Sequence, residues 1–162
     1  MRRSSFRQRG FTIVELLVAM AILGILAGAV MPLGEALVTA QRERELKQAL
    51  WEIRGAIDEF KKVSDRSASG ASPSATSGYP PTLQALVDGV QDSRPENSGK
   101  AVYFLRQIPR DPFAASTLPA EQTWRLRSYA SPADRPLPGS DVYDVRSSSD
   151  ATALDGSTYA SW

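Results

Sequence analysis

The chain carries few side chains that could perform catalysis. It has no histidine and no cysteine, which removes the usual general base, the thiol nucleophile and the common zinc ligands. It also lacks a phosphate-binding loop and a dinucleotide-binding fingerprint. We therefore expect a protein that is not an enzyme.

Carboxylates near the C-terminus form the cluster that could bind a ligand. Asp141, Asp144, Asp150 and Asp155 lie in a stretch that is rich in serine and turn-forming residues. Calcium takes six to eight oxygen ligands from carboxylates, carbonyls and hydroxyls, and its sites need not be rigid. The residue types therefore allow a calcium site. The alternative is a solvated loop in which aspartate and glycine favour turns.

Glu15 is a second candidate for a functional role, because it is the one charge between Phe11 and Gly34. A charge near the start of a membrane span costs roughly 2.5–3.5 kcal/mol, whereas each Leu, Ile, Val or Phe contributes about −0.3 to −0.6 kcal/mol. Twelve such apolar residues lie between Phe11 and Leu33, so insertion is favoured. We interpret Glu15 as a charge kept for a purpose. The alternative is that it lies at the headgroup level without a role.

The stretch around Glu15 predicts a membrane helix. Residues 16–33 carry no charge, and at about 1.5 Å per residue they cross or nearly cross the hydrocarbon core of a bilayer. Four of residues 1–10 are arginine. If the chain is cut after Gly10, Phe11 gains a free amine. That amine could pair with Glu15 one turn away in the same helix, or with Glu15 of a staggered copy.

Residues 10–15 resemble the prepilin signature of type IV pilins and their pseudopilin relatives. Gly10, Phe11, Thr12 and Glu15 match the G-F-T-x-x-E pattern of that family. The resemblance implies cleavage between Gly10 and Phe11 by a prepilin peptidase, followed by N-methylation of Phe11. It also implies assembly of the mature chain into a helical fibre with the apolar helices at its centre.

A secretory signal peptide is the rival interpretation of the same stretch. The arginines would form its basic region, Ile13–Leu26 its apolar region, and Ala27-Gly28-Ala29 an A-x-A cleavage site. Glu15 interrupts that apolar region, and the helical pattern continues beyond Ala29. We therefore favour the prepilin interpretation.

Length and charge narrow the remaining classes of protein. The 162 residues suggest a single domain. Removal of residues 1–10 leaves 15 basic and 18 acidic side chains, so the mature charge is 15 − 18 = −3. This balance gives no support to a nucleic-acid partner. The absence of cysteine means that the fold is held without disulfides.

The resemblance implies the first of five expected segments, the leader, and the pattern of residues predicts the others. We expect a leader at 1–10, a transmembrane and assembly half of a helix at 11–34, its amphipathic half at 35–63, a flexible linker at 64–78 and a globular head at 79–162. Pro32 is expected to kink or locally open the helix rather than to end it. Apolar residues recur in the amphipathic half at spacings of four and three, as one stripe of a helix requires; they are Leu46, Leu50, Ile53, Ile57 and Phe60.

The head is expected to contain both helix and sheet. Thr82 can cap a short helix, residues 82–87. Residues 123–130 and 141–146 alternate between apolar and charged side chains, which predicts two antiparallel strands with one face covered. Core packing is expected for Trp124 and Tyr143. The predicted fold class is α+β and pilin-like, with a long N-terminal helix packed on a small head that has an antiparallel sheet.

The head resembles that of the major pseudopilins of type II secretion systems. Gly78-Tyr79-Pro80, residues 103–113 and residues 142–162 match their G-x-Y-P, Y-L-x-x-L-P-x-D-P and C-terminal segments in part. Major pseudopilins bind calcium in their C-terminal loop. The resemblance therefore implies calcium, with Asp150 and Asp155 as side-chain ligands and Val145 and Ser147 as carbonyl or hydroxyl donors.

The same resemblance implies a structural role in protein export. The chain is expected to be a subunit of a periplasmic pseudopilus, anchored in the inner membrane with its head in the periplasm. Its implied partners are further copies of itself, minor pseudopilins, the prepilin peptidase and an inner-membrane assembly platform. A type IV pilus or competence pilin is the alternative within the family. A soluble secreted binding domain, released from a signal peptide, is the alternative of another class.

Overall fold

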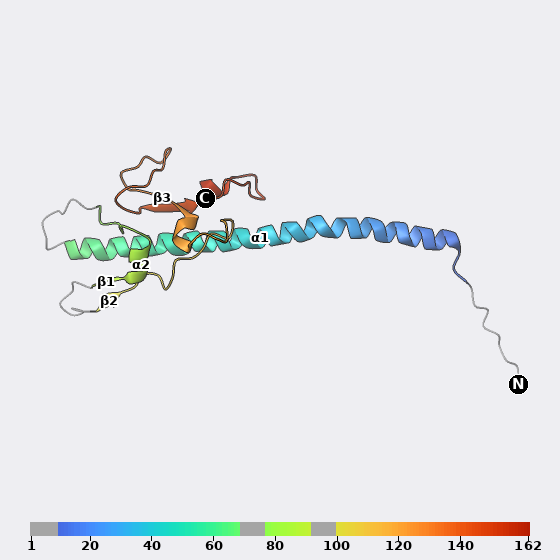
Figure 1. Ribbon diagram of the computed structural model, residues 1–162, viewed down its shortest axis with the longest axis horizontal. Coiled ribbons are helices and arrows are strands. Elements are labelled where there is room, and N and C mark those ends of the chain that lie inside the picture. The colour runs from blue at the N-terminus through green and yellow to red at the C-terminus, as the bar shows by residue number, and fades with distance from the viewer. Residues whose placement is uncertain (1–9, 69–76, 92–99) are drawn as a thin grey trace, which may run out of the picture. The chain divides into compact units, whose positions relative to one another are not determined.

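A computed structural model describes residues 10–68, 77–91 and 100–162, with the backbone alone described for 29–32. Contacts divide the chain into two compact units, Met1–Thr39 and Ala40–Trp162. Figure 1 traces the elements in chain order. The predicted leader, up to residue 9, and the middle of the predicted linker, residues 69–76, lie outside the described residues.

The first helix, α1, covers Ile13–Ala68. It passes through Pro32 without ending there, as predicted. It ends at Ala68 rather than at Val63, so the first residues of the predicted linker are helical. An ion pair between Lys61 Nζ and Asp65 Oδ1, one turn apart, supports these last turns.

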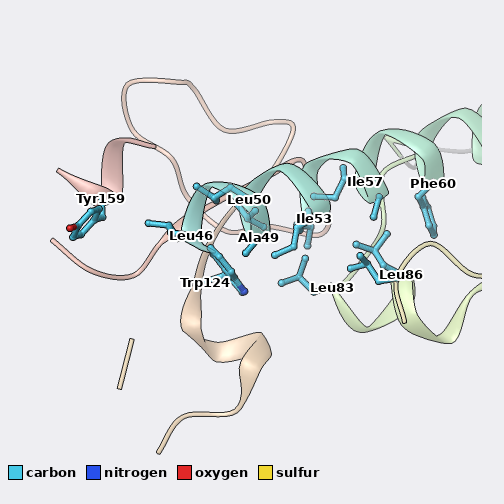
Figure 2. Packing of buried hydrophobic residues seen from close by; sticks show 14 of the residues in the cluster. Leu46, Ala49, Leu50, Ile53, Ile57, Phe60, Leu83, Leu86, Trp124 and Tyr159 are labelled. Carbon is cyan, nitrogen blue, oxygen red and sulfur yellow. The ribbon is translucent and has the colours of Figure 1, made fainter. Parts of the chain in front are cut away.

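The core of the second unit forms around one stripe of α1. Figure 2 shows these α1 side chains with Leu83, Leu86, Trp124 and Tyr159 of the head. The predicted stripe is confirmed, because each of its five members is buried. The buried apolar residues are Leu46, Ala49, Leu50, Ile53, Ala56, Ile57, Phe60, Leu83, Leu86, Leu105, Trp124, Val142, Val145, Ala153 and Tyr159.

Short elements of the head surround this stripe. They are the helix α2 (Gln84–Asp88), the strands β1 (Val90–Gln91), β2 (Ala101–Val102), β3 (Trp124–Arg127) and β4 (Asp144–Ser147), and the 3₁₀ turns η2 (Ala120–Thr123) and η3 (Tyr159–Ser161). Thr82 Oγ1 accepts a hydrogen bond from Ala85 N at 3.3 Å, beside the start of α2.

Two antiparallel pairs of strands make up the sheet structure of the described residues. β1 pairs with β2, which the sequence pattern did not predict, and β3 pairs with β4 as predicted. In the second pair Leu126 lies opposite Val145, and Trp124 lies opposite Ser147. The predicted α+β class, a long helix with a small antiparallel head, is confirmed.

The prediction of core packing holds for Trp124 and fails for Tyr143. Trp124 is buried, and its indole Nε1 donates to the Pro109 carbonyl at 2.8 Å. Tyr143 is 36% exposed and stands edge-on to Tyr79, with 5.0 Å between ring centroids. The cause is the start of β4 at Asp144 rather than at residue 141. Because the chain is not yet a strand at 142–143, Val142 is the residue that reaches the core.

Two buried carboxylates organise the loops around the core. Asp111 accepts from Phe113 N at 2.8 Å through Oδ1, and from Ser147 Oγ at 2.6 Å through Oδ2. Asp141 accepts from Ser128 Oγ and Tyr129 N, each at 2.8 Å, and from Ser77 Oγ. No buried side-chain polar atom of the described residues lacks a partner, as a stable interior requires.

Replacement of Ile53 by alanine is expected to destabilise the second unit strongly. The side chain is 0% exposed, so its loss removes apolar burial and leaves a cavity that costs about 2–5 kcal/mol. Chemical unfolding of the detergent-solubilised protein measures the change. Trp51→Ala, on the exposed face of the same helix, is the control and should change stability far less. Equal losses in the two variants would contradict the assigned core.

Stability is expected to fall on acidification partly through Asp141. Burial raises the pKa of this carboxyl, but hydrogen bonds from Ser77, Tyr129 and Ser128 outweigh burial and hold the pKa below its ordinary value of 3.8. The unfolded chain therefore takes up the proton at a higher pH than the folded chain. The stabilisation of the folded state by ionised Asp141 is fully present above the ordinary pKa of the carboxyl. It is lost as the pH falls through the lowered pKa of the folded state.

Asp141→Asn tests this assignment. At neutral pH it should lower the free energy of unfolding by about 1–3 kcal/mol, and the loss should shrink as the pH falls below about 4. Urea unfolding across that range provides the measurement. Asp134→Asn, at an exposed position, is the matched control. A loss at Asp141 that stays constant with pH would refute the role of its charge.

Candidate functional site

The start of α1 places the predicted processing residues at an accessible position. Gly10 and Phe11 precede the helix, and Phe11 is 84% exposed. Thr12 Oγ1 accepts a hydrogen bond from Glu15 N at 3.2 Å, and Thr12 O accepts from Leu16 N at 3.2 Å. A peptidase that cleaves at Gly10–Phe11 would therefore meet non-helical backbone just before a capped helix.

The hydrogen bond of Thr12 reveals a structural role that the sequence analysis missed. Thr12 and Glu15 form the T-x-x-E pattern of a capping box, in which a threonine hydroxyl satisfies a free backbone amide at the helix start. Glu15 also lies in the first turn of α1, where a negative charge is favoured by the helix dipole. Helix capping by Thr12 is thus distinct from the subunit pairing of Glu15, which stays a prediction.

The N-terminal part of α1 is apolar and uncovered. An 18-residue window in it has a mean hydropathy of 2.6, and none of that window is buried. In length and composition α1 can cross a membrane. Pro32 lies on the described backbone of this helix, and its predicted kink stays a prediction.

Asp150, the first predicted calcium ligand, is paired with an arginine. Arg125 on β3 donates from Nη1 to Oδ1 at 2.8 Å and from Nη2 to Oδ2 at 2.7 Å. Both carboxylate oxygens are therefore engaged by one guanidinium. This hydrogen bonding holds the pKa of Asp150 below its usual value. Both side chains are largely exposed.

Asp155, the second predicted ligand, stabilises a turn. Its Oδ1 accepts from Ser157 N at 2.9 Å and from Ser157 Oγ at 2.6 Å, and these bonds lower its pKa. Gly156 between them has a φ of +86°, a conformation that glycine adopts without steric cost.

Val145 and Ser147, the predicted carbonyl and hydroxyl donors, are engaged inside the fold. The Val145 carbonyl accepts from Arg54 Nη2 at 2.9 Å. Ser147 is buried, and its hydroxyl donates to Asp111 and accepts from Ser149 N at 3.0 Å. Within the described ranges no three His, Cys, Asp or Glu residues converge on a common point. As they stand, the four predicted donors do not fit one calcium ion, and the calcium site stays a prediction.

The structure instead identifies two polar side chains of α1 that hold residues 144–162, the C-terminal segment. Glu43 Oε1 accepts from Leu154 N at 2.8 Å and from the Tyr159 hydroxyl at 3.0 Å. Burial, together with that hydrogen bond, raises the pKa of Tyr159 to about 12. Arg54 donates to Asp144 Oδ1 at 2.8 Å and to Trp162 O at 2.6 Å, besides Val145.

These two residues were missed because their partners lie far away in the sequence. Glu43 and Arg54 read as ordinary charges on the solvated side of an amphipathic helix. One signal was available: Arg54 directly follows Ile53 of the buried stripe, so its side chain leaves the helix at the edge of the core.

Comparison with known proteins matches both parts of the chain. The family described as the prokaryotic N-terminal methylation motif matches residues 5–31. The chain is 31% identical over 114 residues to type II secretion system core protein G of Pectobacterium carotovorum subsp. carotovorum. The matched region covers 68% of this chain and 65% of that protein, which is just under two thirds of its length. It is 32% identical over 114 residues to type II secretion system core protein G of Klebsiella pneumoniae, which covers 67% of this chain and 71% of that protein.

No solved structure matches the chain. The family assignment rests on sequence, because the Klebsiella pneumoniae protein exceeds 30% identity over more than two thirds of its length. The methylation motif supports it independently at the N-terminus. The chain belongs to the pseudopilin family of type II secretion system core protein G.

Proposed function

We propose that the chain is a structural subunit of a type II secretion pseudopilus, a periplasmic fibre that drives protein export across the outer membrane. The observation that carries this proposal is the coincidence of two features in one chain. A methylation motif covers the apolar start of α1, and relatives from type II secretion match about two thirds of the chain. The role is mechanical and needs no catalytic residue in this chain.

Processing at the N-terminus prepares the subunit for assembly in this proposal. Prepilin peptidase cleaves between Gly10 and Phe11, and the new amine of Phe11 is methylated. The exposed position of Phe11 and the helix start directly after it support access to this bond. The apolar part of α1 then anchors the subunit in the inner membrane, with the second unit in the periplasm.

Assembly then proceeds through α1. The apolar window of this helix is uncovered in the monomer, so lipid or identical helices must cover it. Glu15 pairs with the Phe11 amine of a neighbouring copy and sets the register. The assembly platform of the inner membrane and the minor pseudopilins are the further partners, and a cytoplasmic ATPase supplies the energy.

A type IV pilus or competence pilin shares the N-terminal motif and is the second candidate. The names of the matched relatives favour secretion. Location separates the two: a pseudopilus at native expression stays in the periplasm, whereas a pilus reaches the cell surface. Immunogold labelling of intact cells that express the chain at its native level makes the distinction.

Glu15→Gln is expected to leave membrane insertion intact and to reduce fibre yield severely. Glutamine keeps the T-x-x-E/Q capping pattern but removes the charge, so the variant separates helix capping from charge pairing. Fibre yield is measured by shearing and immunoblotting of cells in which the secretion system is overproduced, and export by the amount of secreted cargo.

Glu35→Gln is the matched control, because Glu35 is an exposed carboxylate of α1 beyond the uncharged stretch. Its fibre yield should equal that of the unmodified chain. If Glu15→Gln assembled as well as Glu35→Gln, Glu15 would be a helix-capping residue and its role in register would be removed.

A further inference from the structure

Arg54 occupies a position that resembles the centre of an oxygen-lined cation site. Its guanidinium donates to a carboxylate oxygen of Asp144, the carbonyl of Val145 and the oxygen of Trp162, at 2.8, 2.9 and 2.6 Å. Carboxylate and carbonyl oxygens are the ligand types that calcium takes. Here a planar group with five fixed N–H donors gathers them.

Arg125 likewise binds an oxygen group of the segment, the carboxylate of Asp150. It binds both oxygens of Asp150 in a bidentate pair, the geometry in which guanidinium and carboxylate interact most strongly. The two residues are separated by 25 positions in the chain, so the pair ties the loop after β4 to β3. A calcium ion would have to displace this guanidinium to reach Asp150.

Further polar and aromatic side chains of the segment are engaged in contacts within the second unit. Asp155 is bound to Ser157, and Ser157 Oγ accepts from the Trp162 indole at 2.7 Å. The ammonium of Lys47 lies 4.2 Å from the centre of the Trp162 ring, a cation–π contact. Glu43 holds Leu154 and Tyr159 on α1.

We propose that this chain closes its C-terminal segment with Arg54 and Arg125 instead of the calcium ion that its resemblance to major pseudopilins implied. A guanidinium is protonated at every physiological pH, so the positive charge that closes the segment is always present. The closure therefore needs no calcium ion. Arg54, which binds three oxygens, is the principal group. Arg125 contributes less, because exposed ion pairs are weak. The inference concerns the fold of the second unit and does not depend on fibre formation.

Thermal unfolding of the full mature protein in detergent tests the proposal without any substitution. Calcium alone is the probe. The midpoint of unfolding should be the same in excess EGTA and in millimolar calcium chloride, and calorimetric titration with calcium should give no binding heat. A midpoint that rises with calcium, or saturable binding that disappears in Asp150→Asn, would overturn the proposal.

Substitution of Arg54 provides a second test of the proposal. Arg54→Gln should lower the folded-to-unfolded ratio by a factor on the order of ten or more, because hydrogen bonds to a charged group are lost. It should also expose the C-terminal segment to limited proteolysis. Arg54→Lys should restore little, since an ammonium cannot span three oxygens in the fork geometry of arginine.

Arg44→Gln is the matched control, because Arg44 is an exposed arginine on the same helix. Its unfolding midpoint and proteolysis pattern should match those of the unmodified chain. If Arg54→Gln behaved like Arg44→Gln, or if millimolar calcium restored the stability of Arg54→Gln, the arginine would not be the closing group and the proposal would fail.

Discussion

Burial of one apolar stripe of α1 is the interaction on which the second unit depends. The head has no disulfide, and the strands that the structure describes pair only as two short ladders. Leu46, Ile53 and Ile57 on α1 supply the surface against which Leu83, Leu86 and Val145 pack. Short loops with little regular structure of their own gain a fixed arrangement because a long helix offers them an apolar face. The helix is therefore a structural spine as well as a membrane anchor.

Polar side chains at the edge of that stripe determine how the C-terminal segment is attached. Glu43 and Arg54 lie on the same helix as the core stripe, and between them they bind Asp144, Val145, Leu154, Tyr159 and Trp162. A C-terminal segment that is fixed directly to α1 moves together with that helix. The opposite charges of Glu43 and Arg54 thus fix the segment to the helix, as a metal ion or a disulfide does in other proteins.

Sequence patterns predicted the features that depend on local periodicity and composition. The apolar helix, the buried stripe and the β3–β4 pair follow from spacings of four, three and two residues. The exposure of Tyr143 did not follow, because alternation cannot show where a strand begins. The helix end at Ala68 was missed because serine and alanine read as a linker. Arg54 and Glu43 were missed because their partners lie about a hundred positions away, and a helix pattern says nothing about distant oxygens. The β1–β2 pair is too short to produce a pattern.

Intact mass together with N-terminal sequencing of the membrane-extracted protein tests whether α1 enters the membrane as the start of a processed pseudopilin. We expect a chain that begins at Phe11 and is heavier than its unmodified sequence by one methyl group. A chain that begins near Val30 would show a secretory signal peptide, and an uncut chain that begins at Met1 would show a plain membrane anchor. Either result would contradict assembly through a processed α1.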